Sequence, residues 1–281
     1  PLANRFMAVY HLNNNLYAQA VSSKGRPRQK AIRVCRYEGK YMHVIWTSTN
    51  KFIVFIYRDN QVAALVLKKN GKMIGNEVGL TNVTTGGVYP VEAVAEDESH
   101  AAVYCFHYVE STSTSTLWIS KVNSALTVLD QKNIVETSVD NLMFHGASYD
   151  PGCGTHMVSW SQGMMNPYCC TFDTSFSQLM SATQLAAGTL PFSLVYDPHT
   201  GRFAHMYLAY SLPAGNQPFQ FYLKCYDPID SAFDDEMALK GIHPAGETYA
   251  AGFSREGVLF CGWSSLTGNG GISGLLFKEK K

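Results

Sequence analysis

Four residues of the sequence have side chains that could hold a metal ion or transfer protons on a sugar. His43, Glu92, His145 and Tyr249 come from equivalent segments of a repeating pattern, and aligning these segments on the turn that follows places the four residues at nearly one level. Imidazole, carboxylate and phenol groups gathered in this way could coordinate a metal or perform acid–base work. The alternative is a polar, solvated lining, and we expect no catalytic residue, no metal site and no cofactor.

A second set of residues has the chemistry of sugar binding. Aromatic rings stack against sugar rings, and asparagine side chains in turns can hydrogen-bond with hydroxyl groups. The alternative for the aromatic residues is packing between neighbouring repeats. The candidate ligand-binding residues are Trp46, Trp118, Trp160, Trp263, Asn166, Asn216 and Asn269.

The remaining motifs point to no particular chemistry. The histidines lack H-E-x-x-H spacing, and neither a G-x-S-x-G nor a P-loop pattern is present. The seven cysteines have no C-x-x-C spacing, which predicts buried, reduced thiols instead of disulfides or a zinc site. Acidic residues crowd positions 227–236 and predict a solvated loop, with calcium binding as the alternative.

A repeating element must position all these candidates. Six times along the chain a short apolar strand ends in a Tyr or Trp, at intervals of 47, 51, 52, 50 and 53 residues. Self-similarity at such a period indicates a repeat architecture. The six aromatic residues are Tyr10, Tyr57, Tyr108, Trp160, Tyr210 and Trp263.

Each repeat contains up to four short strands, named A to D in chain order. Asp-Pro followed by Gly marks the turn between strands A and B at Asp150-Pro151 and Asp197-Pro198. Short strands, frequent turns and this period predict an all-β fold, a β-propeller of six blades with four antiparallel strands in a blade. We expect a single domain, 1–281, with repeats at approximately 1–40, 41–89, 90–143, 144–190, 191–247 and 248–281.

The predicted strands do not fill every repeat. Strands B and C occur six times, whereas A and D occur five times each, because the first repeat begins at B and the last stops after C. The terminal residues could complete these two blades, and so could a partner chain. A third alternative is that the chain is a piece of a longer propeller.

One segment resembles a known class of repeat. Residues Leu16 to Ala20, followed by Lys24-Gly25, resemble the C-strand and turn of repeats in lectin-like propellers. The resemblance implies a propeller that binds carbohydrate. The signatures of WD-type, kelch and integrin-type repeats and of fucose-binding propellers are missing, so it identifies no specific family.

The composition argues against some classes of function. Charged residues make up 16% of the chain and balance to a formal net charge of zero, which argues against general capture of nucleic acid. No apolar run reaches the roughly 18 residues of a membrane span. Without a signal-peptide pattern we expect a cytoplasmic or leaderless chain. An extracellular chain released by processing is the alternative, since Pro1 fits a trimmed start or a proteolytic end.

Three functions follow from these observations. The first is a non-enzymatic, lectin-like binding protein whose repeated sites gain avidity for glycans. The second is a protein-interaction or assembly scaffold, with a homo-oligomer completing the terminal blades. The third is a polysaccharide-active enzyme, which would require His145 and Glu92 to converge.

Overall fold

The structure is a computed structural model, and it consists of β-strands and turns. The chain divides into two compact units, residues 1–140 and residues 141–281, each of which is described by itself. Among the described residues, no helix could span a membrane. The structure describes residues 5–22, 26–38, 42–47, 51–58, 61–80, 87–109, 114–137, 142–163, 166–185, 189–209, 220–239, 246–253, 258–265 and 272–278.

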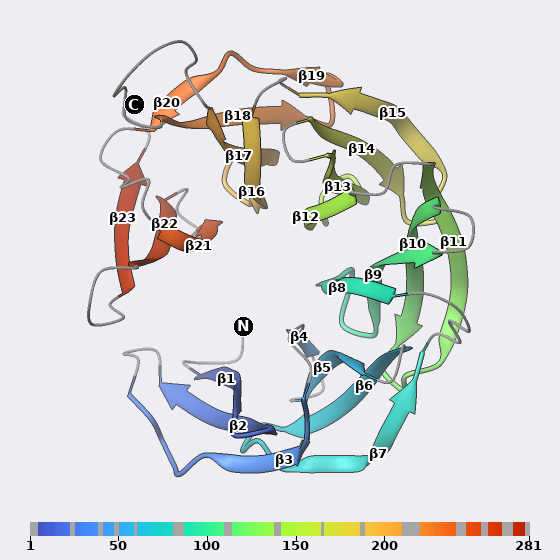
Figure 1. The fold of residues 1–281 in the computed structure, drawn as a ribbon, viewed down its shortest axis with the longest axis vertical. Helices are drawn as coiled ribbons and strands as arrows, with labels where there is room; N and C mark the ends of the chain where they lie inside the picture. The colour runs from blue at the N-terminus through green and yellow to red at the C-terminus, as the bar shows by residue number, and fades with distance from the viewer. Residues whose placement is uncertain are drawn as a thin grey trace. The chain divides into compact units, whose positions relative to one another are not determined.

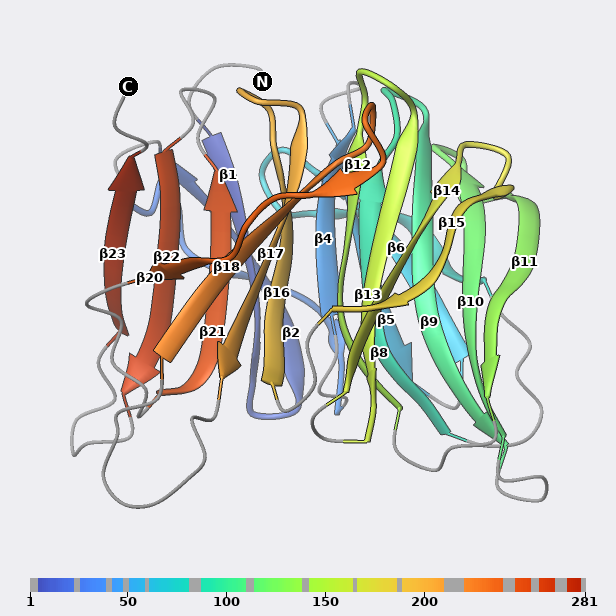
Figure 2. The ribbon, with the colours of Figure 1, turned by 90° about the horizontal axis from the view of Figure 1, so that it is seen from above.

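The first unit contains three antiparallel sheets in which each strand pairs with the next one in sequence (Figure 1). In the third sheet the four strands run side by side along their whole length (Figure 2). The sheets are β1 (Arg5–Leu12), β2 (Asn15–Ser22) and β3 (Ile32–Arg36); β4 (Met42–Thr47), β5 (Lys51–Arg58), β6 (Gln61–Lys68) and β7 (Met73–Gly79); and β8 (Gly87–Ala95), β9 (His100–Val109), β10 (Thr114–Asn123) and β11 (Val128–Thr137).

The second unit repeats this arrangement in three further sheets. Its middle sheet differs in one respect, because two short strands, β19 and β20, both pair with β18. The sheets are β12 (Leu142–Asp150), β13 (Thr155–Gln162), β14 (Pro167–Asp173) and β15 (Gln178–Gln184); β16 (Thr189–Asp197), β17 (Arg202–Ala209), β18 (Gln220–Asp227), β19 (Ala232–Phe233) and β20 (Met237–Leu239); and β21 (Gly246–Phe253), β22 (Val258–Ser265) and β23 (Ile272–Lys278).

The apolar sequence of the middle strands follows from burial on both faces of the sheets. In β5, Phe52, Val54 and Ile56 pack with residues of the β1–β3 sheet. The alternate residues Ile53 and Phe55 pack with the β8–β11 sheet instead. Because side chains alternate between the two faces of a strand, a strand between two sheets needs an almost continuous apolar run.

Three of the hairpins between strands C and D have the same hydrogen bond and a positive φ at the same position. Gly71, Leu126 and Phe176 have φ values of 82°, 65° and 60°, and each donates its N–H to the carbonyl three residues earlier. A Cβ atom on Gly71 would lie 3.2 Å from the Cβ of Ala18 in the neighbouring sheet, so a side chain here would require Ala18 to shift by a few tenths of an ångström. Leu126 and Phe176 are buried, and that burial offsets the roughly 1–2 kcal/mol cost of the left-handed conformation.

The two end sheets have three strands each in the described part of the chain. The first sheet begins at β1, which occupies the B position, and the last ends at β23, which occupies the C position. This agrees with the strand count predicted from the sequence. The predicted repeat boundaries and the single-domain organisation stay predictions.

Candidate functional site

The four residues expected at one level are divided between the two units. In the first unit, His43 lies on β4 opposite Phe55, and Glu92 lies on β8 opposite Tyr104; both side chains are half-buried. Burial lowers the pKa of His43 to about 4. A histidine that stays neutral at pH 7 could accept or donate a proton, but it carries no charge with which to hold an anion.

His145 of the second unit lies at a bulge in β12, between Phe144 and Gly146. Its Nε2 atom is 2.8 Å from Oγ of Ser161, and burial lowers its pKa to about 4. The backbone of Tyr249 pairs with Trp263, while its side chain lies outside the described residues. In the described part of the chain, no group of three His, Cys, Asp or Glu side chains could hold a metal ion.

A second histidine–serine pair lies close to His145. Nε2 of His205, on β17, is 2.7 Å from Oγ of Ser159 on β13, so this hydrogen bond joins neighbouring sheets. Both side chains are fully buried. Burial, followed by the charges of His145 and Lys224, lowers the pKa of His205 to about 3. The distance would suit activation of a serine nucleophile, but the burial of both residues fits a structural role.

The structure places the predicted sugar-binding residues in different environments. Trp160 is fully buried and stacks on Tyr168 at 6.1 Å between ring centroids, so its ring is covered by protein. Trp118 is half-buried, and its Nε1 donates to Oγ1 of Thr116 at 3.0 Å. Asn166 is exposed and its Oδ1 accepts a 3.4 Å hydrogen bond from Gln184. The side chains of Trp46 and Trp263, and all of Asn216 and Asn269, lie outside the described residues.

An Asp-centred turn, which we did not identify as a site from the sequence, recurs between strands A and B. In each of three turns, Oδ1 of an aspartate accepts the N–H two residues later, and Oδ2 contacts the side chain three residues later. The pairs are Asp97 with His100 Nδ1 at 2.8 Å, Asp150 with Cys153 Sγ at 2.7 Å, and Asp197 with Thr200 Oγ1 at 2.8 Å.

Asp150 also connects its turn to the next sheet. Tyr196 of β16 hydrogen-bonds with the Asp150 carboxylate, and the pKa of the Tyr196 phenol is raised first by burial and then by this contact. The Asp-Pro pairs in the sequence marked two of these three turns. The signal that could have identified the full motif is Asp followed three residues later by a side chain that can donate a hydrogen bond.

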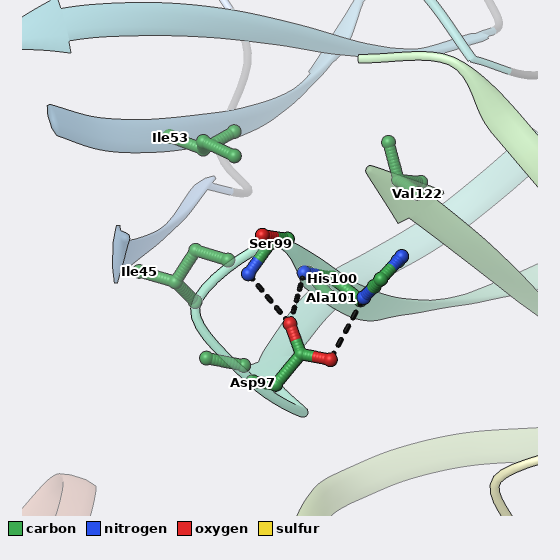
Figure 3. A pocket seen from close by; sticks show the side chains of 8 residues that line it. Ile45, Ile53, Asp97, Ser99, His100, Ala101 and Val122 are labelled. Atoms are coloured by element: carbon green, nitrogen blue, oxygen red, sulfur yellow. Dashed lines mark hydrogen bonds and ion pairs between the residues drawn. The ribbon is translucent and has the colours of Figure 1, made fainter. Parts of the chain in front are cut away.

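The turn of the first unit borders a shallow hollow between two sheets (Figure 3). Ile45 and Ile53 form one wall, from β4 and β5, and the turn between β8 and β9 forms the other. Ile45 and Ile53 are buried, so the accessible part of the hollow is formed by the turn. Its lining residues are Ile45, Ile53, Ala95, Asp97, Ser99, His100, Ala101 and Val122.

The Asp97 carboxylate fixes the turn and the orientation of His100. Its Oδ1 accepts the N–H groups of Ser99 at 2.5 Å and His100 at 2.8 Å, while its Oδ2 lies 2.8 Å from Nδ1 of His100. Burial raises the pKa of Asp97, but these hydrogen bonds outweigh burial and hold the pKa below its ordinary value. An ionised carboxylate can only accept, so Nδ1 of His100 carries a proton. The other ring nitrogen of His100, Nε2, points away from Asp97 (Figure 3).

The side chains of Arg202 and Tyr207 hold part of the acidic loop. The guanidinium of Arg202 contacts Asp234 at 2.6 Å and Asp227 at 3.1 Å. The Tyr207 hydroxyl donates to Glu236. A group that already neutralises two of the carboxylates supports the solvated-loop interpretation over calcium binding.

In sequence, the chain matches no protein-family model and no curated protein. Its structure is similar to the six-bladed fungal lectin from Aleuria aurantia, with a TM-score of 0.61, 12% identity and coverage of 96% of this chain and 90% of the lectin. It is also similar to Kuenenia stuttgartiensis hydrazine synthase (TM-score 0.60, 12% identity, 89% and 70% covered). A third similar structure is an oligogalacturonate lyase in complex with manganese (TM-score 0.55, 9% identity, 92% and 67% covered).

These similarities and the six antiparallel sheets show a β-propeller fold, as the sequence predicts, with the sheets as its blades. The three similar proteins bear names with unrelated activities, at identities of 9% to 12%. The likeness therefore establishes the fold alone, because one fold can carry many functions.

Proposed function

We propose that this protein is a non-enzymatic binding protein for glycans, and that the hollow between the second and third blades is a binding site. The observation that carries the proposal is the accessible Asp97–His100 pair, whose orientation is fixed by hydrogen bonds within its turn. Ligand sites commonly contain a few polar groups of fixed orientation.

A sugar could bind this turn through its hydroxyl groups. One hydroxyl would donate to Nε2 of His100, beside the exposed residues Asp97 and Ser99. Because the contact with Asp97 places a proton on Nδ1, Nε2 is the ring nitrogen that can accept in this tautomer. The shallow hollow predicts a weak site for one sugar residue.

The related turns at Asp150 and Asp197 offer a route to higher affinity. They present the same aspartate-centred geometry, with Cys153 and Thr200 in the place of His100. Several weak sites on one molecule can bind a branched glycan with much greater avidity than any single site. A multivalent glycan should therefore bind more tightly than its monosaccharide.

The test is a broad glycan array followed by NMR titration of the best-binding sugar. The His100→Ala variant should lose at least about tenfold in affinity, because it removes the acceptor. His11→Ala is the matched control, since His11 is an exposed histidine on β1 that lies outside the Asp-centred turns. A silent array, or equal affinity of both variants and the parent protein, would contradict the proposal.

A second candidate is a protein-interaction scaffold, which one observation favours. The outer strands of three blades carry large apolar side chains that are at least half exposed: Leu129 at 50%, Leu179 at 58% and Met237 at 56%. Exposed apolar groups on sheet edges suit contact with another protein. A homo-oligomer completing the end blades belongs to this candidate. Light scattering distinguishes the two functions, since a stable oligomer indifferent to sugars would favour the scaffold.

A further inference from the structure

We propose that the first two blades carry a basic surface that binds a sulfated polysaccharide. Two short segments form this surface, residues 26–33 of the first blade and residues 68–72 of the second. It shares no residue with the hollow at His100, and the choice of a glycan over another polyanion rests on the proposed function. The cationic residues of the basic surface are Arg26, Arg28, Lys30, Arg33, Lys68, Lys69 and Lys72.

The neutral charge of the whole chain conceals an uneven distribution. Residues 1–76 contain 13 of the 22 Lys and Arg residues but only two of the 22 Asp and Glu residues. The formal charge of this stretch is therefore +11, and that of residues 77–281 is −11. An asymmetry of this size favours an anionic partner for the first two blades, whatever the net charge of the chain.

One hydrogen bond joins the two basic segments. Nε2 of Gln29, in the first blade, donates to the backbone carbonyl of Asn70, in the hairpin between β6 and β7. The strands that follow these segments, β3 and β7, are the last strands of neighbouring sheets (Figure 1). Five cations therefore lie within two residues of this one contact: Arg28, Lys30, Lys68, Lys69 and Lys72.

Backbone hydrogen bonds fix both segments. In the first, the N–H of Arg28 donates to the carbonyl of Ala20 in β2 at 2.9 Å. In the second, the N–H of Lys68 donates to the carbonyl of Lys72 at 2.8 Å, and the N–H of Gly71 donates to the carbonyl of Lys68 at 2.8 Å. Cations on a fixed backbone lose less conformational freedom on binding than cations on a disordered chain.

The fold does not require the lysines of the second segment. The equivalent hairpins at residues 123–127 and 173–177 form the same two backbone hydrogen bonds and contain neither Lys nor Arg. All seven cations of the basic surface are exposed. Within the described ranges none of them forms an ion pair, whereas Arg58 of the second blade contacts Glu77 at 2.7 Å. These cations are therefore available to an external anion.

The residue types of the basic surface favour a polysaccharide over a nucleic acid. Proteins that bind single-stranded nucleic acid combine cations with aromatic rings on which the bases stack. Residues 26–33 and 68–72 contain no aromatic residue. Three of the seven cations are arginines, whose planar guanidinium can donate two hydrogen bonds to one anionic group. Sulfate groups along a sugar chain would meet these cations without any need for stacking.

The experiment is a calorimetric titration of the protein with a short heparin oligosaccharide. Affinity should fall at least about tenfold between about 50 and 200 mM sodium chloride, because binding releases counterions. The desulfated oligosaccharide should bind at least about tenfold more weakly. A DNA duplex of matched length is the competing polyanion. Binding that is indifferent to salt or to sulfate, or a duplex that binds as tightly as heparin, would overturn the proposal.

Single substitutions test whether the two segments act together. Lys30→Gln and Lys69→Gln, one in each segment, should both weaken heparin binding several-fold and lower its salt dependence. Lys132→Gln is the matched control, since Lys132 is an exposed lysine of β11 outside the basic surface. Equal affinity of Lys30→Gln, Lys69→Gln and the parent protein would also overturn the proposal. His100→Ala should bind heparin as the parent protein does, so failure of the His100 site and failure of the basic surface are distinguishable.

Discussion

His100 in the first unit and His205 in the second show how the same side chain serves different purposes in one fold. Each ring has one short hydrogen bond, to Asp97 at 2.8 Å and to Ser159 at 2.7 Å. His100 remains partly exposed at the rim of a hollow, whereas His205 is fully buried between blades. A histidine with a well-placed hydrogen-bond partner is therefore not by itself evidence of a binding site. The ring must also be accessible to a ligand.

The hydrogen-bond partners of the two histidines also differ in how well they can stabilise a charged imidazole. The Asp97 carboxylate can stabilise a charged imidazole, but the Ser159 hydroxyl can do so only weakly. The second ring nitrogen of His205, Nδ1, is buried and has no hydrogen-bond partner. His205 therefore supports the fold only in its neutral form.

The largest effect expected from the buried histidines is a loss of stability in mild acid. The pKa values of His205 and His145 are lowered from 6.5 to about 3 and about 4, so both residues take up protons more readily in the unfolded chain. Their contribution is complete above pH 6.5 and decreases as the pH falls toward those values. Each histidine should lower the free energy of unfolding by about 1.4 kcal/mol for each pH unit below 6.5. The two together should lower it by about 5 kcal/mol at pH 4.5.

Urea denaturation at several pH values between 7 and 4.5 measures this dependence. His205→Gln keeps an amide near the position of Nε2 and removes the titration, so its free energy of unfolding should vary less steeply with pH. His100→Gln should retain the slope of the parent protein. Equal slopes for all three proteins would show that the buried pair does not control acid stability.

A somewhat smaller effect should separate the two histidines at pH 7. His205→Ala leaves a cavity and a buried Ser159 hydroxyl without its partner, which should lower the free energy of unfolding by about 3 kcal/mol. His100→Ala should change it by no more than about 0.5 kcal/mol, as is usual at exposed positions. Thermal unfolding monitored by circular dichroism would contradict the comparison if the two variants melted together.

The fold was predictable because burial on both faces of each sheet leaves a repeated mark in the sequence. Runs such as residues 52–56 are apolar at every position, and the turns recur at a near-constant period. The conformation of Leu126 and Phe176 was not predictable from these patterns. Both adopt a backbone that favours glycine, and only burial of their side chains in the folded blades makes this favourable.

The candidate site was less predictable, because the sequence does not show which side chains are covered. Trp160 and Asn166 were proposed for the same purpose, yet one is fully buried and the other exposed. His145 was aligned with Glu92, but its hydrogen-bond partner is Ser161, brought across from β13 by a bulge. The Asp97–His100 turn depends on hydrogen bonds between residues only two or three apart, and its spacing could have been found in the sequence.

The smallest effect concerns one ion pair in each unit. In the first unit, Nζ of Lys121 lies 2.8 Å from a Glu96 carboxylate whose side chain is only 3% exposed. In the second, Arg202 binds Asp234 and Asp227, and its side chain is 37% exposed. Lys121→Met should lower the free energy of unfolding by about 2 kcal/mol because it removes a positive charge from beside a buried carboxylate, whereas Arg202→Met should lower it by less than about 1 kcal/mol.

Added salt distinguishes these two pairs. Exposed charges are screened more strongly than buried ones, so 1 M sodium chloride should remove most of the difference between Arg202→Met and the parent protein. The difference for Lys121→Met should persist. Urea denaturation with and without salt measures both. If salt removed both differences equally, Glu96 would behave as a solvated charge, and the distinction between covered and accessible groups would then be limited to the histidines.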